Sequence, residues 1–87
     1  MTKVIYTAVF KKKISKFINK NPLLDKTFRK QFKRFKENPY HVGLRLHRLK
    51  GERSSQYAIR IEGDLRALAI REDDAYIFFD LIKHDEY

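Results

Sequence analysis

The sequence of 87 residues predicts an α+β fold, with two N-terminal helices packed on a mainly antiparallel β-sheet in the order β-α-α-β-β-β-β. Three observations predict it. A short run of β-branched and aromatic residues opens the chain, and two segments with apolar residues at helical spacing follow. After Pro39 the helical period does not return, and apolar residues alternate with polar ones instead. The length fits one domain, which we place at residues 1–87.

The first half of the chain predicts one strand and both helices. Residues 4–9 form the β-branched and aromatic run. From Phe10 onwards one apolar face repeats at helical spacing, formed by Phe10, Ile14, Phe17 and Ile18. Asn21 suits the cap of a second helix and Pro22 its first position, and Asn38-Pro39 ends that helix. Its apolar stripe is Leu24, Phe28, Phe32 and Phe35.

The second half predicts four strands. Residues 42–49 alternate and place Val42, Leu44 and Leu46 on one side. A polar loop follows at residues 50–56. Three further strands are predicted at residues 56–62, 65–71 and 75–83, separated by Gly63-Asp64 and Asp73-Asp74.

The first hairpin can take two registers. A two-residue turn would pair Glu62 with Leu65 and put Arg60 and Arg66 on opposite faces of the sheet. A three-residue loop, 62–64, would pair Ile61 with Leu65 and bring Arg60 opposite Arg66. The second register gathers the apolar residues on one face, so we predict that register. These residues are Tyr57, Ile59, Ile61, Leu65, Ala67 and Ala69.

Similar reasoning at the next turn predicts a loop at residues 72–74. It places Ile77, Phe79 and Leu81 with the apolar set. It places on the arginine face Tyr76, Phe78, Asp80, Ile82 and His84. Two opposed arginines destabilise a sheet unless an anion lies between them, which predicts a phosphate site. The alternative is that Asp80 and Glu62 neutralise the arginines as ion pairs.

Charge and composition narrow the classes of function. The net charge is +9, and the positive excess lies in residues 1–53, which indicates an anionic partner such as RNA, DNA or an acidic protein. The chain has no cysteine, which excludes thiolate catalysis and fits a reducing compartment. No apolar run approaches the roughly 20 residues that cross a bilayer, so we expect a cytoplasmic protein without membrane contact.

The candidate chemistry is metal-free RNA cleavage. His41, His47 and His84 lack the spacing of metal ligands, and we expect neither a metal nor a cofactor. In this reaction a base takes the proton of a ribose 2′-hydroxyl, which attacks the adjacent phosphate, and an acid protonates the departing 5′ oxygen. His47 and His84 are candidates for base and acid, and surrounding cations would stabilise the transition state.

Four motifs resemble the RelE/ParE superfamily of bacterial type II toxins: Leu49-Lys50-Gly51, residues 57–61, Leu65-Arg66 and residues 84–87. The size and element order are similar as well. Ala58 stands where RelE itself has a lysine, which disfavours a RelE-like lysine-based mechanism. Through its histidines, the sequence resembles the YoeB-like and YafQ-like ribonucleases more closely than RelE itself. The resemblance implies a toxin neutralised by a cognate antitoxin, acting on mRNA as a metal-free, ribosome-dependent endoribonuclease.

The resemblance also implies roles for individual residues. Arg66 matches the arginine that contacts the scissile phosphate, and Arg60 a basic position that supports the same phosphate. His47 matches the proposed base and His84 the proposed acid. Tyr87 resembles a terminal tyrosine that stacks on a base or joins proton transfer.

Lys50 and Arg48 complete the expected substrate-binding set. The superfamily also contains ParE-like members that inhibit DNA gyrase and cleave no RNA. A ParE-like toxin is therefore an alternative, as is a catalytically inactive member that binds only an antitoxin or nucleic acid.

Overall fold

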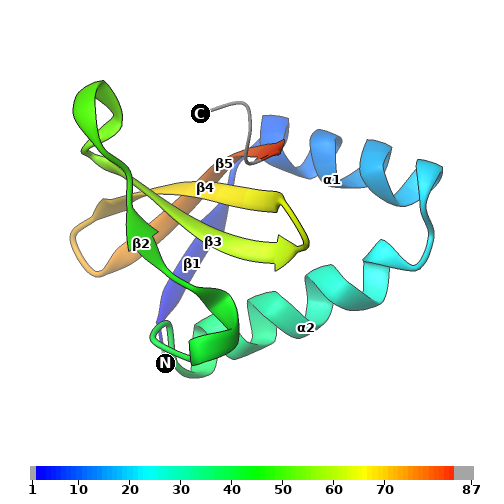
Figure 1. Ribbon diagram of the computed structural model, residues 1–87, viewed down its shortest axis with the longest axis horizontal. Coiled ribbons are helices and arrows are strands. Elements are labelled where there is room, and N and C mark those ends of the chain that lie inside the picture. Colours follow the sequence, from blue (N-terminus) through cyan, green and yellow to red (C-terminus); the bar gives the residue numbers. More distant parts are fainter. Residues whose placement is uncertain (1, 84–87) are drawn as a thin grey trace.

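Two helices and a five-stranded sheet make up the computed structural model, which describes residues 2–83 (Figure 1). The helices are α1 (Ala8–Lys20) and α2 (Leu24–Glu37), with short 3₁₀ helices η1 (Val42–Leu44) and η2 (Gly51–Arg53) further along. The strands are β1 (Lys3–Tyr6), β2 (His47–Arg48), β3 (Gln56–Glu62), β4 (Leu65–Glu72) and β5 (Ala75–Lys83). The predicted fold class and element order are confirmed.

The strands lie in the order β1-β5-β4-β3-β2. β1 runs parallel to β5, and the other three pairings are antiparallel. Both helices cover one face of this sheet, and we call the opposite face the open face. The long strands therefore have one side that is buried under the helices and a second side that can carry a functional site.

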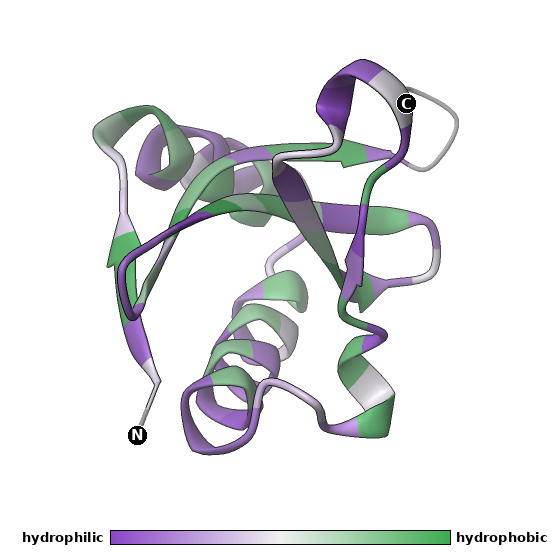
Figure 2. Cartoon of the chain, turned by 90° about the vertical axis from the view of Figure 1, so that its left-hand side faces the viewer, coloured by the Kyte–Doolittle hydropathy of each residue, from purple (hydrophilic) through white to green (hydrophobic). Residues whose placement is uncertain are grey.

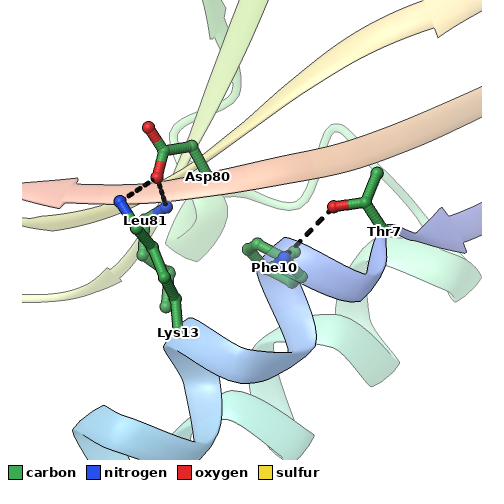
Figure 3. Close-up of polar contacts among 5 residues, drawn as sticks. All are labelled: Thr7, Phe10, Lys13, Asp80 and Leu81. Atoms are coloured by element: carbon green, nitrogen blue, oxygen red, sulfur yellow. Dashed lines mark hydrogen bonds and ion pairs between the residues drawn. The ribbon is translucent and has the colours of Figure 1, made fainter.

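The start of α1 differs from the prediction. Thr7 caps the helix, because its Oγ1 accepts a hydrogen bond of 3.1 Å from the backbone N–H of Phe10 (Figure 3). The helix therefore begins at Ala8, and β1 ends at Tyr6. Val9 lies in the first helical turn and is 61% exposed, so its assignment to a strand was wrong.

The junction between the helices also differs in detail. The backbone N–H of Asn21 donates to the carbonyl of Phe17 at 2.9 Å, so Asn21 ends α1 instead of capping α2. Pro22 precedes α2, which begins at Leu24. The last residue of α2 is Glu37, and Asn38 caps its end, as the predicted stop at Asn38-Pro39 requires. Neither helix of residues 2–83 is long and apolar enough to cross a membrane.

The main core lies between the helices and the sheet. The four predicted stripe residues of α2 are all buried, and the hydropathy colours alternate around that helix in Figure 2. Phe78 from β5 sits among aromatic rings, with its centroid 5.1 Å from that of Phe32 and 5.3 Å from that of Phe35. Such edge-to-face contacts add to the apolar burial and fix how the sheet packs on the helices.

The predicted strand at residues 42–49 is mostly absent. Residues 42–44 form η1 instead, where Nδ1 of His41 accepts a 3.0 Å hydrogen bond from the N–H of Gly43. Arg45 then turns the chain with a φ of 50°. Of the predicted strand, only residues 47–48 are extended within the described chain, as β2, and they pair with two residues of β3. Among residues 2–83, no strand lies beside the edge of β3 beyond this pairing.

Candidate functional site

Arg60 and Arg66 pair directly across β3 and β4, as predicted. The turn that achieves this is different, because Glu62 pairs with Leu65 across the two residues Gly63 and Asp64. A bulge between Arg60 and Glu62 then shifts the register by one residue. The predicted three-residue loop was therefore wrong, while the predicted position of the two arginines is confirmed.

The second hairpin corrects part of the face assignment. Glu72 pairs with Ala75 across a two-residue turn, so the predicted loop at residues 72–74 was wrong. Tyr76 and Phe78 belong to the helix-side core, against the prediction. A bulge between the Ala69–Phe78 and Leu68–Asp80 pairs then reverses the alternation.

For Leu81 and Ile82, which follow this bulge, the predicted faces are correct. Leu81 lies in the helix-side core, and Ile82 packs in a second, smaller cluster. Phe79 was predicted on the helix-covered face, but it packs against the smaller cluster, so this prediction was wrong. Ile77 was predicted on the same face and is not part of the helix-side core either.

This second cluster forms an apolar floor on the open face. Its buried members are Leu49, Ala58, Leu68 and Ile82. Arg66 pairs with Ile82, and Arg60 follows Ala58 by two residues on the same side of β3. The two guanidinium-bearing side chains are therefore next to a low-dielectric surface, where an anion would interact with them more strongly than in water.

Neither arginine is neutralised by an acid within residues 2–83. Nη1 of Arg66 donates to the carbonyl oxygens of Gly63 at 2.6 Å and Leu65 at 3.3 Å. Asp80 instead pairs with Lys13 of α1 and accepts from the N–H of Leu81 (Figure 3). The alternative in which Asp80 neutralises the arginines is therefore not observed.

Glu62 does not neutralise the arginines either. Its Oε1 accepts a hydrogen bond of 3.5 Å from Thr27 of α2. Arg60 and Arg66 are both half-buried. In the part of the chain that the structure describes, they form an opposed cationic pair without a carboxylate.

His47 lies on the same face. It pairs with Ala58, two residues before Arg60, which makes His47 and Arg60 diagonal neighbours on adjacent strands. Nδ1 of His47 is 2.9 Å from the carbonyl oxygen of Arg45. A carbonyl oxygen can only accept, so Nδ1 carries the hydrogen. In the tautomer that keeps this contact, Nε2 is the proton acceptor, and among residues 2–83 it has no hydrogen-bond partner.

Lys50 and Arg48 both lie beside His47. A cavity of about 300 Å³ is lined by His47, Arg48, Leu49, Lys50 and Arg53. The guanidinium of Arg48 lies 6.0 Å from the ring centroid of Tyr57, and its Nε donates to the carbonyl of Ser54 at 2.5 Å. These contacts direct Arg48 away from the arginine pair. Arg53, which the sequence did not single out, joins the cavity through η2.

Gln31 is a site-supporting residue that the sequence analysis missed. It is only 5% exposed, and its Nε2 donates to the carbonyls of Arg60 at 2.7 Å and Gly43 at 3.2 Å. Its Oε1 accepts from Nη1 of Arg34 at 3.1 Å. One side chain of α2 thus holds the free edge of β3 at the arginine pair. The available signal was a polar residue inside an otherwise apolar helical stripe.

The predicted acid His84 and the predicted stacking residue Tyr87 lie outside the described residues. Among residues 2–83 no group of three or more His, Asp or Glu side chains is placed to hold a metal ion.

No family model and no curated protein matches the sequence, whereas solved structures match it along almost its whole length. A copper-bound mutant toxin from Helicobacter pylori superimposes with a TM-score of 0.78 at 23% identity, covering 99% of this chain and 98% of that one. YafQ from Escherichia coli gives 0.74 at 15% identity, with 99% and 97% covered. A YoeB/ParE toxin from Agrobacterium tumefaciens gives 0.73 at 13% identity, with 94% and 98% covered.

YafQ has also been solved with DinJ in a toxin-antitoxin complex, and that YafQ chain matches with a TM-score of 0.73 at 15% identity, covering 99% of this chain and 97% of its own. The structural neighbours thus include YafQ-like and YoeB-like toxins. The chain has the fold of the RelE/ParE-like toxins.

Proposed function

We propose that the protein is the toxin of a type II toxin-antitoxin system and cleaves mRNA as a metal-free, ribosome-dependent endoribonuclease. The observation that carries the proposal is the opposed pair of Arg60 and Arg66, which has no carboxylate partner within residues 2–83. Two half-buried cations on an open sheet face suit a phosphate. The shared fold of YafQ and YoeB supports a toxin role.

The proposed reaction uses the free ring nitrogen of His47. Nε2 takes the proton of a ribose 2′-hydroxyl, and the resulting oxygen attacks the adjacent phosphorus. Arg66 contacts the phosphate oxygens and Arg60 supports the same group, so both stabilise the negative charge that grows in the transition state. His84 gives a proton to the departing 5′ oxygen. The products are a 2′,3′-cyclic phosphate and a free 5′-hydroxyl.

Other cations would bind and orient the RNA. Lys50 and Arg48, in the cavity beside His47, are proposed to contact the strand next to the cleaved bond, and Tyr87 to stack on a base. The exposed lysines of α1 and α2 suit ribosomal RNA phosphates. A site of this kind works in the cytoplasm, where mRNA is translated.

A cognate antitoxin is the second proposed partner. The net charge of +9 favours an acidic partner, and the similarity to YafQ, solved in complex with DinJ, supports a protein inhibitor. Co-expression with the small protein encoded beside this chain should restore growth. Failure of every adjacent small protein to bind or neutralise it would contradict this part of the proposal.

The decisive experiment is cleavage of mRNA on programmed ribosomes, comparing the wild type with Arg66→Ala. The wild type should cleave the message and the variant should not, while both should remain folded. Growth arrest by the wild type with intact mRNA would overturn the proposal. If the mRNA stays intact and the protein inhibits the supercoiling of DNA by gyrase, the result would instead support a ParE-like toxin.

A further inference from the structure

A pocket lies between α2 and the part of the β3 edge that β2 does not cover. It is next to the arginine pair, but beyond the edge of the sheet. Its volume is about 330 Å³. We call it the α2–β3 pocket, and it is lined by Thr27, Lys30, Gln31, Arg34, Gly43, Arg60, Ile61, Glu62 and Gly63. It exists because β2 pairs with only two residues of β3 and leaves the rest of that edge to α2. None of the proposed catalytic steps uses its helix residues.

Arg34 is held in this pocket in a fixed position. It is half-buried, and its Nη1 donates to Oε1 of Gln31 at 3.1 Å. The guanidinium lies over Gly43, where an added Cβ would come within 3.0 Å of Nη1. Glycine therefore makes room for the cation. A guanidinium has five N–H donors, and within residues 2–83 this one has only Gln31 as a side-chain partner.

The charges around the pocket favour an anion. Lys30 and Arg34 are one helical turn apart, a spacing at which like charges destabilise a helix. The carboxylate in the lining is that of Glu62, whose Oε1 accepts from Thr27 at 3.5 Å. By contrast Arg29, on the same helix, is paired with Asp25 at 3.1 Å. Lys30 and Arg34 have no such carboxylate partner among the described residues.

The pocket is continuous with the proposed phosphate site through Arg60. The side chain of Arg60 faces Arg66 across the strands, and Arg60 also lines the pocket. Its carbonyl is bonded to Gln31, which in turn holds Arg34. One short polar chain therefore links the two cationic positions around the edge of β3.

We propose that the α2–β3 pocket holds a second phosphate of the bound RNA strand, contacted by Lys30 and Arg34, while the scissile phosphate lies at Arg60 and Arg66. This inference rests on the proposed function and adds a path for the substrate, from the open face around the edge of β3 onto α2. An acidic peptide would also suit the cations, but continuity with the arginine pair favours the nucleic acid.

The test uses oligoribonucleotides with 2′-O-methyl groups, which cannot be cleaved because the attacking hydroxyl is blocked. A dinucleotide has one phosphate and a tetranucleotide has three. The full chain, isotope-labelled, is titrated with each by two-dimensional NMR. Both ligands should shift the amides of Arg60 and Arg66, and only the tetranucleotide should also shift those of Arg34 and Gly43.

Arg34→Gln should weaken tetranucleotide binding about tenfold and leave dinucleotide binding unchanged. The slope of log affinity against log salt should fall by about 0.7, as for one lost phosphate contact on a single strand. Arg29→Gln removes the same charge from the same helix and is the matched control, with no such loss expected. Glu62→Gln removes the opposing charge and should strengthen tetranucleotide binding.

The outcomes separate the two proposals. Failure of the wild type to cleave mRNA on programmed ribosomes would overturn the proposed function together with this inference. Cleavage there, with no tetranucleotide-specific shifts at Arg34 and Gly43, would overturn the second phosphate site alone. RNA binding that Arg34→Gln and Arg29→Gln weaken equally, or that neither weakens, would overturn the second phosphate site alone. Spectra of both variants that match the wild type away from the substitution would show that folding is intact.

Discussion

Arg60 and Arg66 lie directly opposite each other on β3 and β4, and within residues 2–83 neither side chain meets a carboxylate. Like charges in this position cost roughly 0.2–1 kcal/mol of stability. Asp80 lies opposite Leu68, two residues along β4 from Arg66, yet its carboxylate pairs with Lys13. The sheet therefore keeps a repulsive pair, as expected if the proposed phosphate site is correct.

Arg60→Gln should separate stability from activity. Its side chain makes no hydrogen bond within the described residues, so the free energy of unfolding should stay the same or rise by up to about 1 kcal/mol. Cleavage should fall on the order of 100-fold, because one cation of the transition-state pair is lost. Urea unfolding and ribosome-programmed cleavage measure the two effects. Arg71→Gln is the control, since Arg71 lies 5.5 Å from the Tyr76 ring, away from the site.

His47→Gln should lower the cleavage rate by about 100-fold to 10,000-fold, the range for loss of a general base. RNA binding should change little, so the full loss of rate should persist in single-turnover measurements at saturating substrate. His41→Asn is the matched control, because an asparagine oxygen can still accept from the N–H of Gly43. Cleavage by His47→Gln at the rate of the control would exclude His47 as the base.

The sequence predicted most of the fold because the long elements have clear periodicities. The three strands of the meander were placed almost to the residue, and both helices with their apolar stripes. Residues 42–49 failed because the apolar residues alternate there too, while the cap by His41 and the positive φ of Arg45 leave no signal in alternation. Two residues of β2 were all that remained.

The face of each strand residue was harder to predict because bulges cannot be seen in alternation. Arg60 and Arg66 came out opposed although the loop was wrong, since the bulge beside Ile61 compensates for the shorter turn. In β5 the predicted loop was one residue too long, and the bulge that compensates for it comes only before Asp80. Phe78 was therefore predicted on the wrong face. Packing against the aromatic rings of α2 determines on which face Phe78 lies, and such packing joins residues that are far apart in the sequence.

The ion pair between Lys13 and Asp80 should contribute little to stability. The two side chains are 42% and 30% exposed, so water screens the attraction. A double-mutant cycle with Lys13→Met and Asp80→Asn should give a coupling energy below about 1 kcal/mol, and high salt should reduce it. Asparagine keeps an acceptor for the N–H of Leu81, so the bulge is preserved. A coupling of several kcal/mol would contradict this view.

Tyr6 should make the fold less stable at high pH. Burial raises the pKa of its phenol above the ordinary value of 10.0, because desolvation disfavours the charged form. Unfolding above pH 10.0 would therefore release a proton that the folded protein retains, and the free energy of unfolding should fall as pH rises. Tyr6→Phe should make this fall shallower in urea titrations between neutral and alkaline pH. An unchanged slope would contradict the prediction.

Replacing Gln31 and Gln56 by methionine should have different effects on the free energy of unfolding. Gln31 donates to two backbone carbonyls and accepts from Arg34, so Gln31→Met leaves buried polar groups without partners. It should lower the free energy of unfolding by about 1–3 kcal/mol.

Gln56 is the matched control, because its Oε1 is buried without a hydrogen-bond partner among the described residues. Gln56→Met removes an unsatisfied group and should be neutral or stabilising. Urea unfolding of both variants measures the contrast. Gln31→Met should also reduce cleavage more than Gln56→Met does, because Gln31 holds the backbone of Arg60. Equal destabilisation by the two substitutions would mean that the hydrogen bonds of Gln31 do not support the edge of β3.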